Sequence, residues 1–419
     1  MTLFTNIKSF DKSFLLKLWL SLILYQLSVC PVSAQKDTMD IKDYILIINT
    51  YTESFPWSNR LISTATNFVK DDPKLAVYTE HMNMIMIDND SILDQFKDSL
   101  FDRYGSHRPR MLLLLGNSSL ILKDDLRKMW GDIPMVLCAG KDYTGPEHYY
   151  LTKQPIPLSE RVPLAELSQS CNLTYLYANL YIHENVEMMF RTLPRMKRFI
   201  YVGDERFVNQ VNSQEIQEIL RTKHPDDIKK TNQLIDSLNF VDPRTTGILF
   251  SSWFHKRQFA GNMMLTMILP EIVSTVSPPI FALNMIELND KESGMVGGYT
   301  YDQNHFNEKL SNMFSEILSG KSPRDLPHYL PTDGTPLINY QVLVRKGLSP
   351  DEWPAHTRFL NKPITFWDKY KYFLPGTAVC IALLVWFFLY RIRTLTHLRQ
   401  IQLKEIEAMA NYKNLIDNM

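Results

Sequence analysis

A stretch without a single charged side chain, Tyr372–Tyr390, divides the chain near its carboxyl end. At about 1.5 Å of rise per residue, a helix of about nineteen residues spans ~28 Å, close to the hydrocarbon thickness of a bilayer. Trp386 and the two terminal tyrosines are ring types that favour the membrane interface. Pro375 lies in the first turn, where a proline costs little helix stability. The stretch predicts a transmembrane helix, with the residues before and after it on opposite sides of a membrane.

The amino-terminal segment, residues 1–34, has the order of charge and apolarity that is typical of an export signal. Three lysines precede the apolar core Leu18–Val29, and Val32-Ser33-Ala34 offers small residues for cleavage after the alanine. An uncleaved anchor is the alternative, because Phe14–Leu16 could lengthen the core. Cys30 follows a valine, a poor residue before a lipidated cysteine, so a lipoprotein is set aside.

The export signal decides the predicted topology, because basic residues are balanced around the span. Four lie just before it and four just after it: Arg358, Lys362, Lys369 and Lys371, then Arg391, Arg393, Arg399 and Lys404. We therefore expect residues from about Gln35 to Lys371 outside the cytoplasm and the tail inside.

Composition bounds the class of protein. The 419 residues include 45 basic and 45 acidic side chains, a balance that gives no support for a nucleic-acid-binding surface. A hydrophobic content of 45% suits a globular chain with a core, and the length allows two or three domains.

Cys138 and Cys171 are the cysteines of the exported part. An oxidising compartment permits a disulfide between them, but two separate buried thiols fit better, because Cys138 ends an apolar run. The sequence leaves their pairing open.

Short apolar runs recur through the exported region and predict buried strands. They are Ile45–Ile48, Leu75–Tyr78, Met111–Leu115, Met135–Cys138, Phe199–Val202, Ile248–Phe250, Ile280–Leu283 and Met295–Val296. Most end in a polar or glycine turn, such as Gly116-Asn117 and Gly297-Gly298. Continuous apolar runs of this length suit parallel strands covered on both faces.

Helical stripes lie between these runs. Apolar residues follow one helix face after Pro56, again from Ile182 to Leu193, and again from Phe306 to Ile317. The last stripe is expected to begin near Asp302 and to end at Gly320. Alternating strands and helices predict an α/β fold with parallel sheets.

The predicted strands fall into two groups, separated by a gap between about Tyr150 and Arg198 that we interpret as a crossing between two lobes. After the last helix, Leu326–Pro336 is rich in proline, and Leu337–Val344 alternates like a strand returning toward the first lobe. A hinge of several strands would permit closure over a ligand. The predicted lobes are lobe 1 at about 42–155 and 337–350, and lobe 2 at about 178–325.

At this point the exported region resembles a known family. The matching stretches are YILIINTYTESFPWSNRL (Tyr44–Leu61), IPMVLCAG (Ile133–Gly140), LPRMKRFIYVGDERF (Leu193–Phe207), GMVGGYTYD (Gly294–Asp302) and ILSGKSPRDLP with INYQVLVRKGL (Ile317–Leu348). In order and spacing they are similar to the type I periplasmic binding proteins, in the version called ABC-transporter substrate-binding-like. The resemblance implies two Rossmann-like lobes over residues 42–350. One departure is Asn209–Asp242, which is mostly polar and helical in pattern, so that the second lobe is expected to be reduced.

Joined to a membrane span, such a domain resembles the extracytoplasmic sensor half of bacterial, often hybrid, sensor histidine kinases. Residues 351–371, with FLNKPITFWDKYKYF (Phe359–Phe373), look like a membrane-approach segment, and 391–411 has near-helical apolar spacing for a signalling helix. Residues 412–419, within ANYKNLIDNM, are similar to the start of a PAS domain. The resemblance implies a homodimer in a bacterial inner membrane, with a periplasmic sensor domain and a cytoplasmic tail. The intact protein would be a histidine kinase, although this chain carries no kinase catalytic module.

Ligands in open α/β sheets sit at the carboxyl ends of strands, and in this fold between two lobes. By that rule the candidate ligand-binding residues are Thr50, Tyr51, Glu53 and Trp57 after the first strand, Asn117 and Ser118 after the third, Gly140 and Lys141 after the fourth, and Asp204, Ser252, Trp253 and Tyr299 from the second lobe. Aromatic rings supply stacking surfaces and polar groups fix orientation. The structural alternative is that Trp57 belongs to its helix's core stripe and that Glu53 or Asp204 caps a helix.

The sequence contains none of three common catalytic or nucleotide-binding motifs, and its one candidate metal site is disfavoured. The sequence lacks G-x-S-x-G, G-x-G-x-x-G and G-x-x-x-x-G-K-[ST], so those hydrolase and nucleotide sites are unsupported, and we expect no cofactor. His81–Met86, with its alternating methionines, suggests a soft-metal site, but packing against a sheet is favoured.

Three functions remain. The first is a ligand sensor that binds a small molecule or a ligand-loaded partner protein and passes lobe closure through the membrane helix. The second is a membrane-tethered substrate-binding protein of an ABC transporter, which would need neither a helical tail nor a PAS-like start. The third is a structural surface protein with a vestigial cleft.

Overall fold

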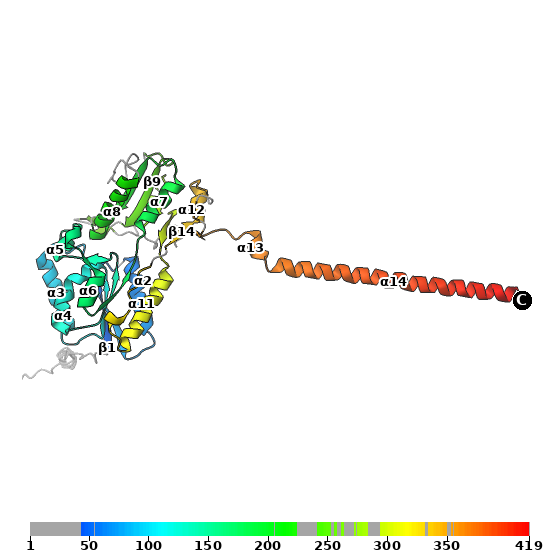
Figure 1. The fold of residues 1–419 in the computed structure, drawn as a ribbon, viewed down its shortest axis with the longest axis horizontal. Coiled ribbons are helices and arrows are strands. Elements are labelled where there is room, and N and C mark those ends of the chain that lie inside the picture. Colours follow the sequence, from blue (N-terminus) through cyan, green and yellow to red (C-terminus); the bar gives the residue numbers. More distant parts are fainter. Residues whose placement is uncertain are drawn as a thin grey trace, which may run out of the picture. The chain divides into compact units, whose positions relative to one another are not determined.

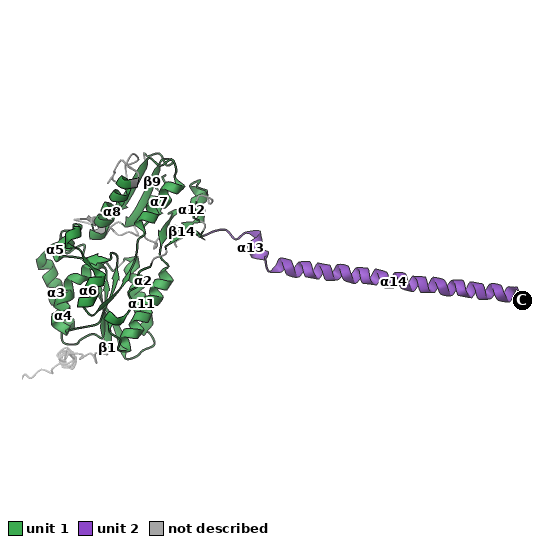
Figure 2. Cartoon of the chain, in the orientation of Figure 1, with its two compact units in different colours: residues 1–360 green, residues 361–419 purple. Residues whose placement is uncertain are grey.

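A computed structural model describes residues 43–418, apart from residues 54, 205, 224–240, 253–254, 258–260, 264–271, 274, 284–293, 332–333, 350–352 and 355. Two compact units divide the chain between Leu360 and Asn361 (Figure 2). The predicted export signal lies outside the described residues.

The first lobe contains β1 and the helices drawn around it in Figure 1. It is built on a five-stranded parallel sheet with the order β2-β1-β3-β4-β7. Its strands are β1 (Asp43–Asn49), β2 (Leu75–His81), β3 (Met111–Leu115), β4 (Met135–Ala139) and β7 (Leu173–Tyr177). Alternate residues of a strand point to opposite faces. Ile45 and Ile47 therefore enter one hydrophobic cluster, while Leu46 and Ile48 enter another. Helices cover both faces, which explains why these strands read as continuous apolar runs.

Two helices cover one face of this sheet and three cover the other. Residues of α2 (Pro56–Val69) and α11 (Gln303–Leu318) share the first cluster, and residues of α3 (Asp90–Tyr104), α4 (Lys123–Trp130) and α6 (Leu164–Ser170) share the second. Shorter elements complete the lobe: η1 (Asn117–Leu122), α5 (Glu147–Leu151), η2 (Leu158–Glu160), η4 (Pro323–Asp325) and the strand pair β5 (Tyr143–Thr144) and β6 (Val162–Pro163). Pro56 begins α2 as predicted, and the Asp302 side chain caps α11 by accepting from the Asn304 and His305 amides.

The second lobe has a six-stranded sheet with the order β15-β14-β13-β12-β9-β8. Its strands are β8 (Arg198–Gly203), β9 (Thr246–Ser252), β12 (Ile280–Ala282), β13 (Gly297–Thr300), β14 (Thr335–Asn339) and β15 (Arg358–Leu360). One cluster joins this sheet to α7 (Ile182–Thr192), α8 (Phe207–Lys223) and α12 (Tyr340–Arg345). A separate hairpin pairs β10 (His255–Arg257) with β11 (Gly261–Met263). With six strands the lobe is not reduced, although the helical pattern after Asn209 holds as far as α8 is described.

Two segments belong to the opposite lobe from the one predicted. Leu337–Val344 does not return to the first sheet: β14 pairs antiparallel with β13, and the chain turns into α12 where the Asn339 side chain accepts from the Val342 amide. Instead, α11 returns to the first lobe, because Phe306 and Phe314 pack in the cluster of α2. An apolar stripe shows that a helix covers a sheet, but not which sheet.

The predicted crossing between Tyr150 and Arg198 contains a strand that the sequence analysis missed. Here β7 pairs with β4 and forms the edge of the first sheet, so lobe 1 extends to about Tyr177. Its alternating threonine and tyrosines hide it among polar residues. The crossing itself is short, from Ala178 to Tyr181.

The glycine pair predicted as a turn is part of β13. Gly297 lies opposite Phe281 of β12, and Gly298 lies opposite Leu337 of β14. A Cβ on Gly298 would lie 2.0 Å from the Ala282 carbonyl oxygen, so this close approach requires glycine. The strand therefore begins after Met295–Val296, which are buried beside it.

The two cysteines in the described part of this unit are free thiols, Cys138 buried in β4 and Cys171 partly exposed after α6. The expectation of two separate thiols is confirmed, but Cys171 is not fully buried. In the methionine-rich stretch, Met82 and Met84 are buried in the core as predicted.

The sheet unit extends to Leu360, past the predicted boundary at 350 and into the predicted membrane-approach segment. The second unit contains α13 (Phe366–Tyr370) and α14 (Phe373–Asp417), a single helix of 45 residues. Among the residues described, this is the helix long and apolar enough to cross a membrane. The PAS-like stretch after Ala410 continues the same helix as far as Asp417.

Candidate functional site

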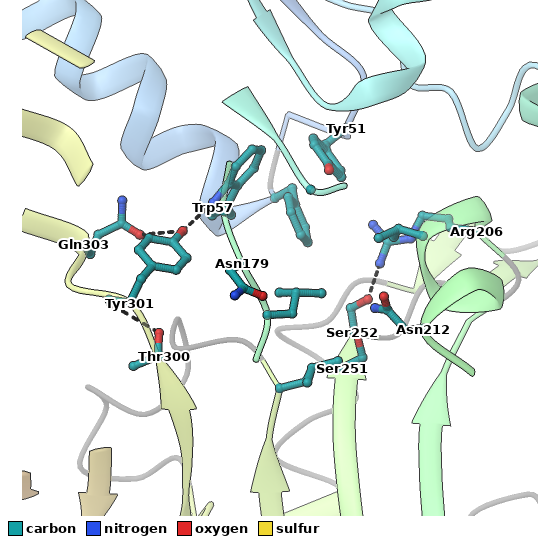
Figure 3. A pocket seen from close by; sticks show the side chains of 16 residues that line it. Tyr51, Trp57, Asn179, Arg206, Asn212, Ser251, Ser252, Thr300, Tyr301 and Gln303 are labelled. Atoms are coloured by element: carbon teal, nitrogen blue, oxygen red, sulfur yellow. Dashed lines mark hydrogen bonds between the residues drawn. The ribbon is translucent and has the colours of Figure 1, made fainter. Parts of the chain in front are cut away.

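A cleft between the two lobes is lined by residues that follow the carboxyl ends of strands, as expected for an α/β ligand site. It has two compartments of about 680 and 670 Å³, both open to solvent, which share Tyr51, Gly140, Arg206 and Val208. We call them the aromatic compartment and the basic compartment. Figure 3 shows the first, with Trp57 and Tyr301 on one side and Arg206 and Asn212 on the other.

Three rings after β1 form the wall of the aromatic compartment. Tyr51 stacks on Phe55 with centroids 4.6 Å apart and meets Trp57 edge-on at 5.5 Å. The Trp57 indole donates to the Tyr301 hydroxyl at 3.0 Å, which fixes the indole plane. Burial raises the pKa of Tyr51 to about 12, so its hydroxyl stays a neutral donor and acceptor at physiological pH. The wall can therefore stack on a planar or apolar ligand group.

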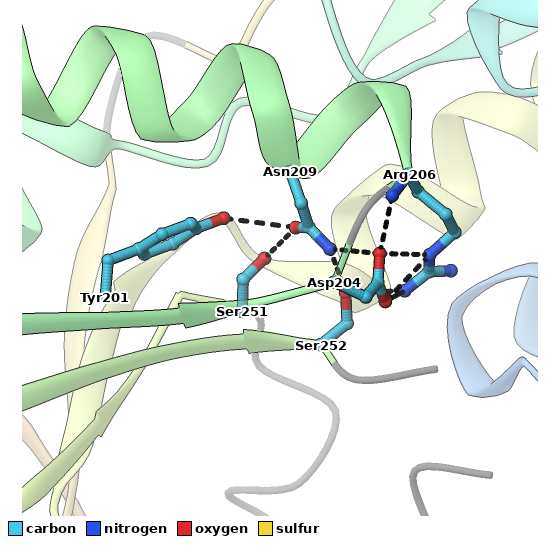
Figure 4. Close-up of polar contacts among 6 residues, drawn as sticks. All are labelled: Tyr201, Asp204, Arg206, Asn209, Ser251 and Ser252. Atoms are coloured by element: carbon cyan, nitrogen blue, oxygen red, sulfur yellow. Dashed lines mark hydrogen bonds and ion pairs between the residues drawn. The ribbon is translucent and has the colours of Figure 1, made fainter. Parts of the chain in front are cut away.

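Opposite this wall, Arg206 is held by a buried polar cluster (Figure 4). Its Nε lies 2.9 and 3.0 Å from the two oxygens of Asp204, and Nη2 donates to Asp204 at 2.7 Å and to Ser252 at 2.6 Å. Asn209 donates to both Asp204 and Ser252, and its carbonyl oxygen accepts from Tyr201 and Ser251. The guanidinium lies 5.3 Å from the Phe55 ring centre, so it reaches from the second lobe to the first.

Asn212 on α8 is fully buried and lines the aromatic compartment beside Arg206. Neither of its side-chain amide atoms makes a hydrogen bond of normal geometry among the described residues, although the amide lies close enough to the Tyr201 hydroxyl to oppose the rise in that tyrosine's pKa on burial. Buried polar groups in proteins nearly always pair. An amide with spare hydrogen-bonding capacity on the wall of a cleft can pair with a ligand or a water.

The basic compartment takes its charge from Lys141, Lys153 and Arg206. Lys141 reaches across the lobes to Glu215 of α8 at 2.8 Å. Lys153 donates to the carbonyl oxygens of Met84 and Ile87 at 2.6 and 2.5 Å, and no carboxylate within salt-bridge distance of it is recorded in the described part of the chain.

Lys153 should make the stability of the protein depend on pH. Burial lowers the pKa of this lysine from 10.5 to about 8, although Asp88 partly opposes the effect. Between these values the unfolded chain holds more protons than the folded one, so the free energy of unfolding rises with pH. We expect wild type to gain stability relative to Lys153→Met as pH rises from about 8 to about 10.5, with a constant difference below pH 8. Urea unfolding of both proteins at several pH values checks this, and an unchanging difference across the window would contradict it.

Asn117 has a structural role at the cleft floor. Its amide donates to the carbonyls of Lys141 and Tyr143 at 2.8 Å, and its oxygen accepts from the Gly140 and Lys141 amides. Because both its side-chain nitrogen and its side-chain oxygen bond to backbone groups, Asn117 stabilises the conformation of the loop after β4.

Most of the residues predicted for the site come together at the cleft. Those that line it are Thr50, Tyr51, Trp57, Asn117, Ser118, Gly140, Lys141 and Ser252. Asp204 lies behind the wall and holds Arg206, Glu53 is exposed and lines neither compartment, and Trp253 lies outside the described residues. Tyr299 lies at the hinge, where its hydroxyl pairs with His356 at 3.2 Å and its ring packs near Tyr181.

Sequence reasoning missed several lining residues: Phe55, Lys153, Arg206, Asn212 and Tyr301. Arg206 was within reach, because it follows Gly203-Asp204 at a predicted strand end. Lys153 and Asn212 were not, because they lie beyond the turns that follow the strands.

The hinge beside the cleft is braced by one buried side chain. The Asn185 amide lies within 3.0–3.1 Å of the carbonyl oxygens of Leu180, Tyr181 and Tyr299, and its oxygen accepts from the Tyr299 amide at 2.7 Å. It therefore joins the crossing at 178–181 to the end of β13, where the chain leaves the second lobe.

No protein-family model matches the chain, and no curated protein matches it in sequence. Solved structures share its fold. A conserved domain protein from Vibrio cholerae O1 biovar El Tor is 14% identical with a TM-score of 0.53, covering 76% of this chain and 99% of that one. The ABC domain from Streptococcus pneumoniae, in complex with L-Trp, is 11% identical with a TM-score of 0.51 and the same coverage. At these identities the likeness shows the fold alone, and it confirms the predicted α/β fold with parallel strands.

Proposed function

We propose that this chain is a membrane-anchored ligand sensor, the input part of a two-component receptor. A small molecule, or a ligand-loaded partner protein, binds in the cleft and favours the closed arrangement of the lobes. Closure is passed through the membrane helix to a cytoplasmic tail, in a homodimer in a bacterial inner membrane. A ligand shifts this equilibrium only by its differential affinity for the open and closed states.

The cleft supports the binding half of the proposal. Its walls come from both lobes, combine an aromatic surface with polar groups, and include the buried Asn212 amide. The pneumococcal domain of similar fold is in complex with L-Trp, a small-molecule ligand.

One observation carries the sensor half: α14 continues as one unbroken helix from the apolar stretch to Asp417. Helix rigidity allows a displacement or rotation at one end to reach the other. The chain enters this unit directly after β15, the edge strand of the second lobe's sheet. Movement of that lobe would therefore pull on the segment that leads to the helix.

Ligand binding is tested by thermal unfolding of the full chain in lipid nanodiscs with amino acids, pentoses, hexoses and aromatic carboxylates. A stabilising compound supports the cleft as a binding site, and its effect should be lost in Trp57→Ala. If no compound raises the unfolding temperature, the result favours the alternative function, a structural surface protein with a vestigial cleft.

An experiment on the tail distinguishes a sensor from the tethered binding protein of a transporter. With native cysteines replaced by serine and Thr396→Cys introduced, disulfide formation between tails in a dimer reports their packing. A sensor predicts that the stabilising compound changes the cross-linking rate, and that deletion of residues 392–409 leaves its affinity unchanged. A tether predicts no change in rate, and loss of binding in the deletion would contradict both assignments.

A further inference from the structure

The charged residues that line the described part of the cleft are of one sign. Every charged side chain among the described residues that line either compartment is basic: Lys141, Lys153 and Arg206. Asp204 is held by Arg206 and Asn209, and Glu215 by Lys141, while Asp88 acts on Lys153 from beyond salt-bridge distance.

Lys153 is the cation of this set with no salt bridge among the described residues, although Asp88 lies near enough to raise its pKa slightly against the effect of burial. Its ammonium has three N–H donors, two of which face the Met84 and Ile87 carbonyls. The remaining donor is available to a ligand in the basic compartment. A half-buried positive charge that is not neutralised attracts an anion more strongly than the same charge would in water.

Arg206 lies between the two compartments and lines both. Its Nε and Nη2 bind Asp204 and Ser252, while no contact of Nη1 is recorded among the described residues. On the aromatic side the Asn212 amide has hydrogen-bonding capacity beyond its contact with Tyr201, and the stacked Tyr51–Phe55 pair lies across the cleft. One elongated ligand could therefore stack at one end and present an acidic group at the other.

We propose that the cleft selects an elongated organic anion, with a planar apolar part in the aromatic compartment, an acidic group facing Lys153, and no ammonium group. The inference rests on the proposed function. The ammonium of a free amino acid would enter a cleft whose described lining offers no free carboxylate, and burying a charge without a partner is costly.

The test compares three ring-matched probes on the full chain: indole-3-propionate, its primary amide, and L-tryptophan. Calorimetric titration is expected to give an affinity for the acid about ten- to a hundredfold above that for the amide, the effect of hydrogen bonds to a charged group. L-Tryptophan should bind more weakly than the acid. Phosphate- and sulfate-bearing aryl compounds then show which anionic group fits.

Two substitutions test whether Lys153 is the residue that recognises the acidic group of the ligand. Lys153→Met should remove the preference for acid over amide, whereas Lys153→Arg should keep most of it. Lys123→Met, which removes a lysine from α4 that pairs with Asp124, is the matched control and should change nothing.

The outcomes separate the two claims. Tighter binding of L-tryptophan, or equal binding of acid and amide, overturns the anion inference and leaves ligand binding in place. Acid preference that survives Lys153→Met also overturns it. If neither these probes nor the sugars and amino acids stabilise the chain, the proposed function itself fails.

Discussion

Replacement of Asp204 by asparagine is expected to lower the free energy of unfolding by about 3 kcal/mol and to abolish ligand binding. The Asp204 side chain is 2% exposed and the side chain of its partner Arg206 is 15% exposed, so the ion pair is largely shielded from solvent. Removing one partner leaves a buried positive charge without compensation, which costs more than the pair contributes. Arg206 would also lose the contacts that hold it between the two compartments.

Urea unfolding followed by tryptophan fluorescence measures this loss. Asp132→Asn is the matched control, because Asp132 binds Arg324 at 3.0 Å on the surface, where an ion pair contributes under about 1 kcal/mol. The double variant Asp204→Leu, Arg206→Met removes both charges and should regain much of the stability without regaining ligand affinity. Asp204→Asn unfolding no more easily than Asp132→Asn would contradict this account of the cluster.

Replacement of Asn185 by leucine is expected to cost about 3 kcal/mol and to loosen the hinge. The side chain is fully buried, and its loss leaves the Tyr299 amide and nearby carbonyls without their partner. Each buried polar group left unpaired costs about 1–3 kcal/mol. Because these groups belong to two crossings, the variant should change lobe closure as well as stability.

Hydrogen exchange measures both the loss of stability and the loosening of the hinge that we expect in Asn185→Leu. Amides at 178–181 and 298–301 should exchange faster than in wild type, while those of β1 and β3 should not. Asn307→Leu is the control, since Asn307 is only partly buried and accepts one hydrogen bond from Gln303 at 2.8 Å. Unfolding at the same urea concentration in both variants would show that Asn185 does not brace the hinge.

The sequence predicted the strands that are covered on both faces and the helices that carry one clear stripe. Met111–Leu115 and the helix after Pro56 were predicted correctly, because buried positions are apolar and therefore give these elements a recognisable apolar pattern. It did not predict β7, where threonine and tyrosine interrupt the pattern, or the lobe to which α11 and β14 belong. Partner choice depends on contacts far apart in the chain, which local patterns do not record.

For the site, the rule of strand ends predicted residues that line the cleft, among them Tyr51, Trp57 and Lys141. It failed for Tyr299, because the β13 end points into the hinge, and for Glu53, which is exposed. Arg206 lies three residues after the end of β8, so the same rule could have predicted it, whereas Asn212 lies further on, in α8. The burial of Asn212 beside the cleft depends on the packing of that helix, which is not visible in sequence.

The account's central claim is that a ligand binds between the lobes and brings them together. Hydrogen exchange of the full chain, with and without the most stabilising compound of the thermal panel, tests it most directly. The account predicts slower exchange on both walls at once, at 50–57 and 139–141 in the first lobe and at 206–212 in the second, together with the hinge at 178–181. Protection confined to one lobe, or located away from these segments, would contradict it.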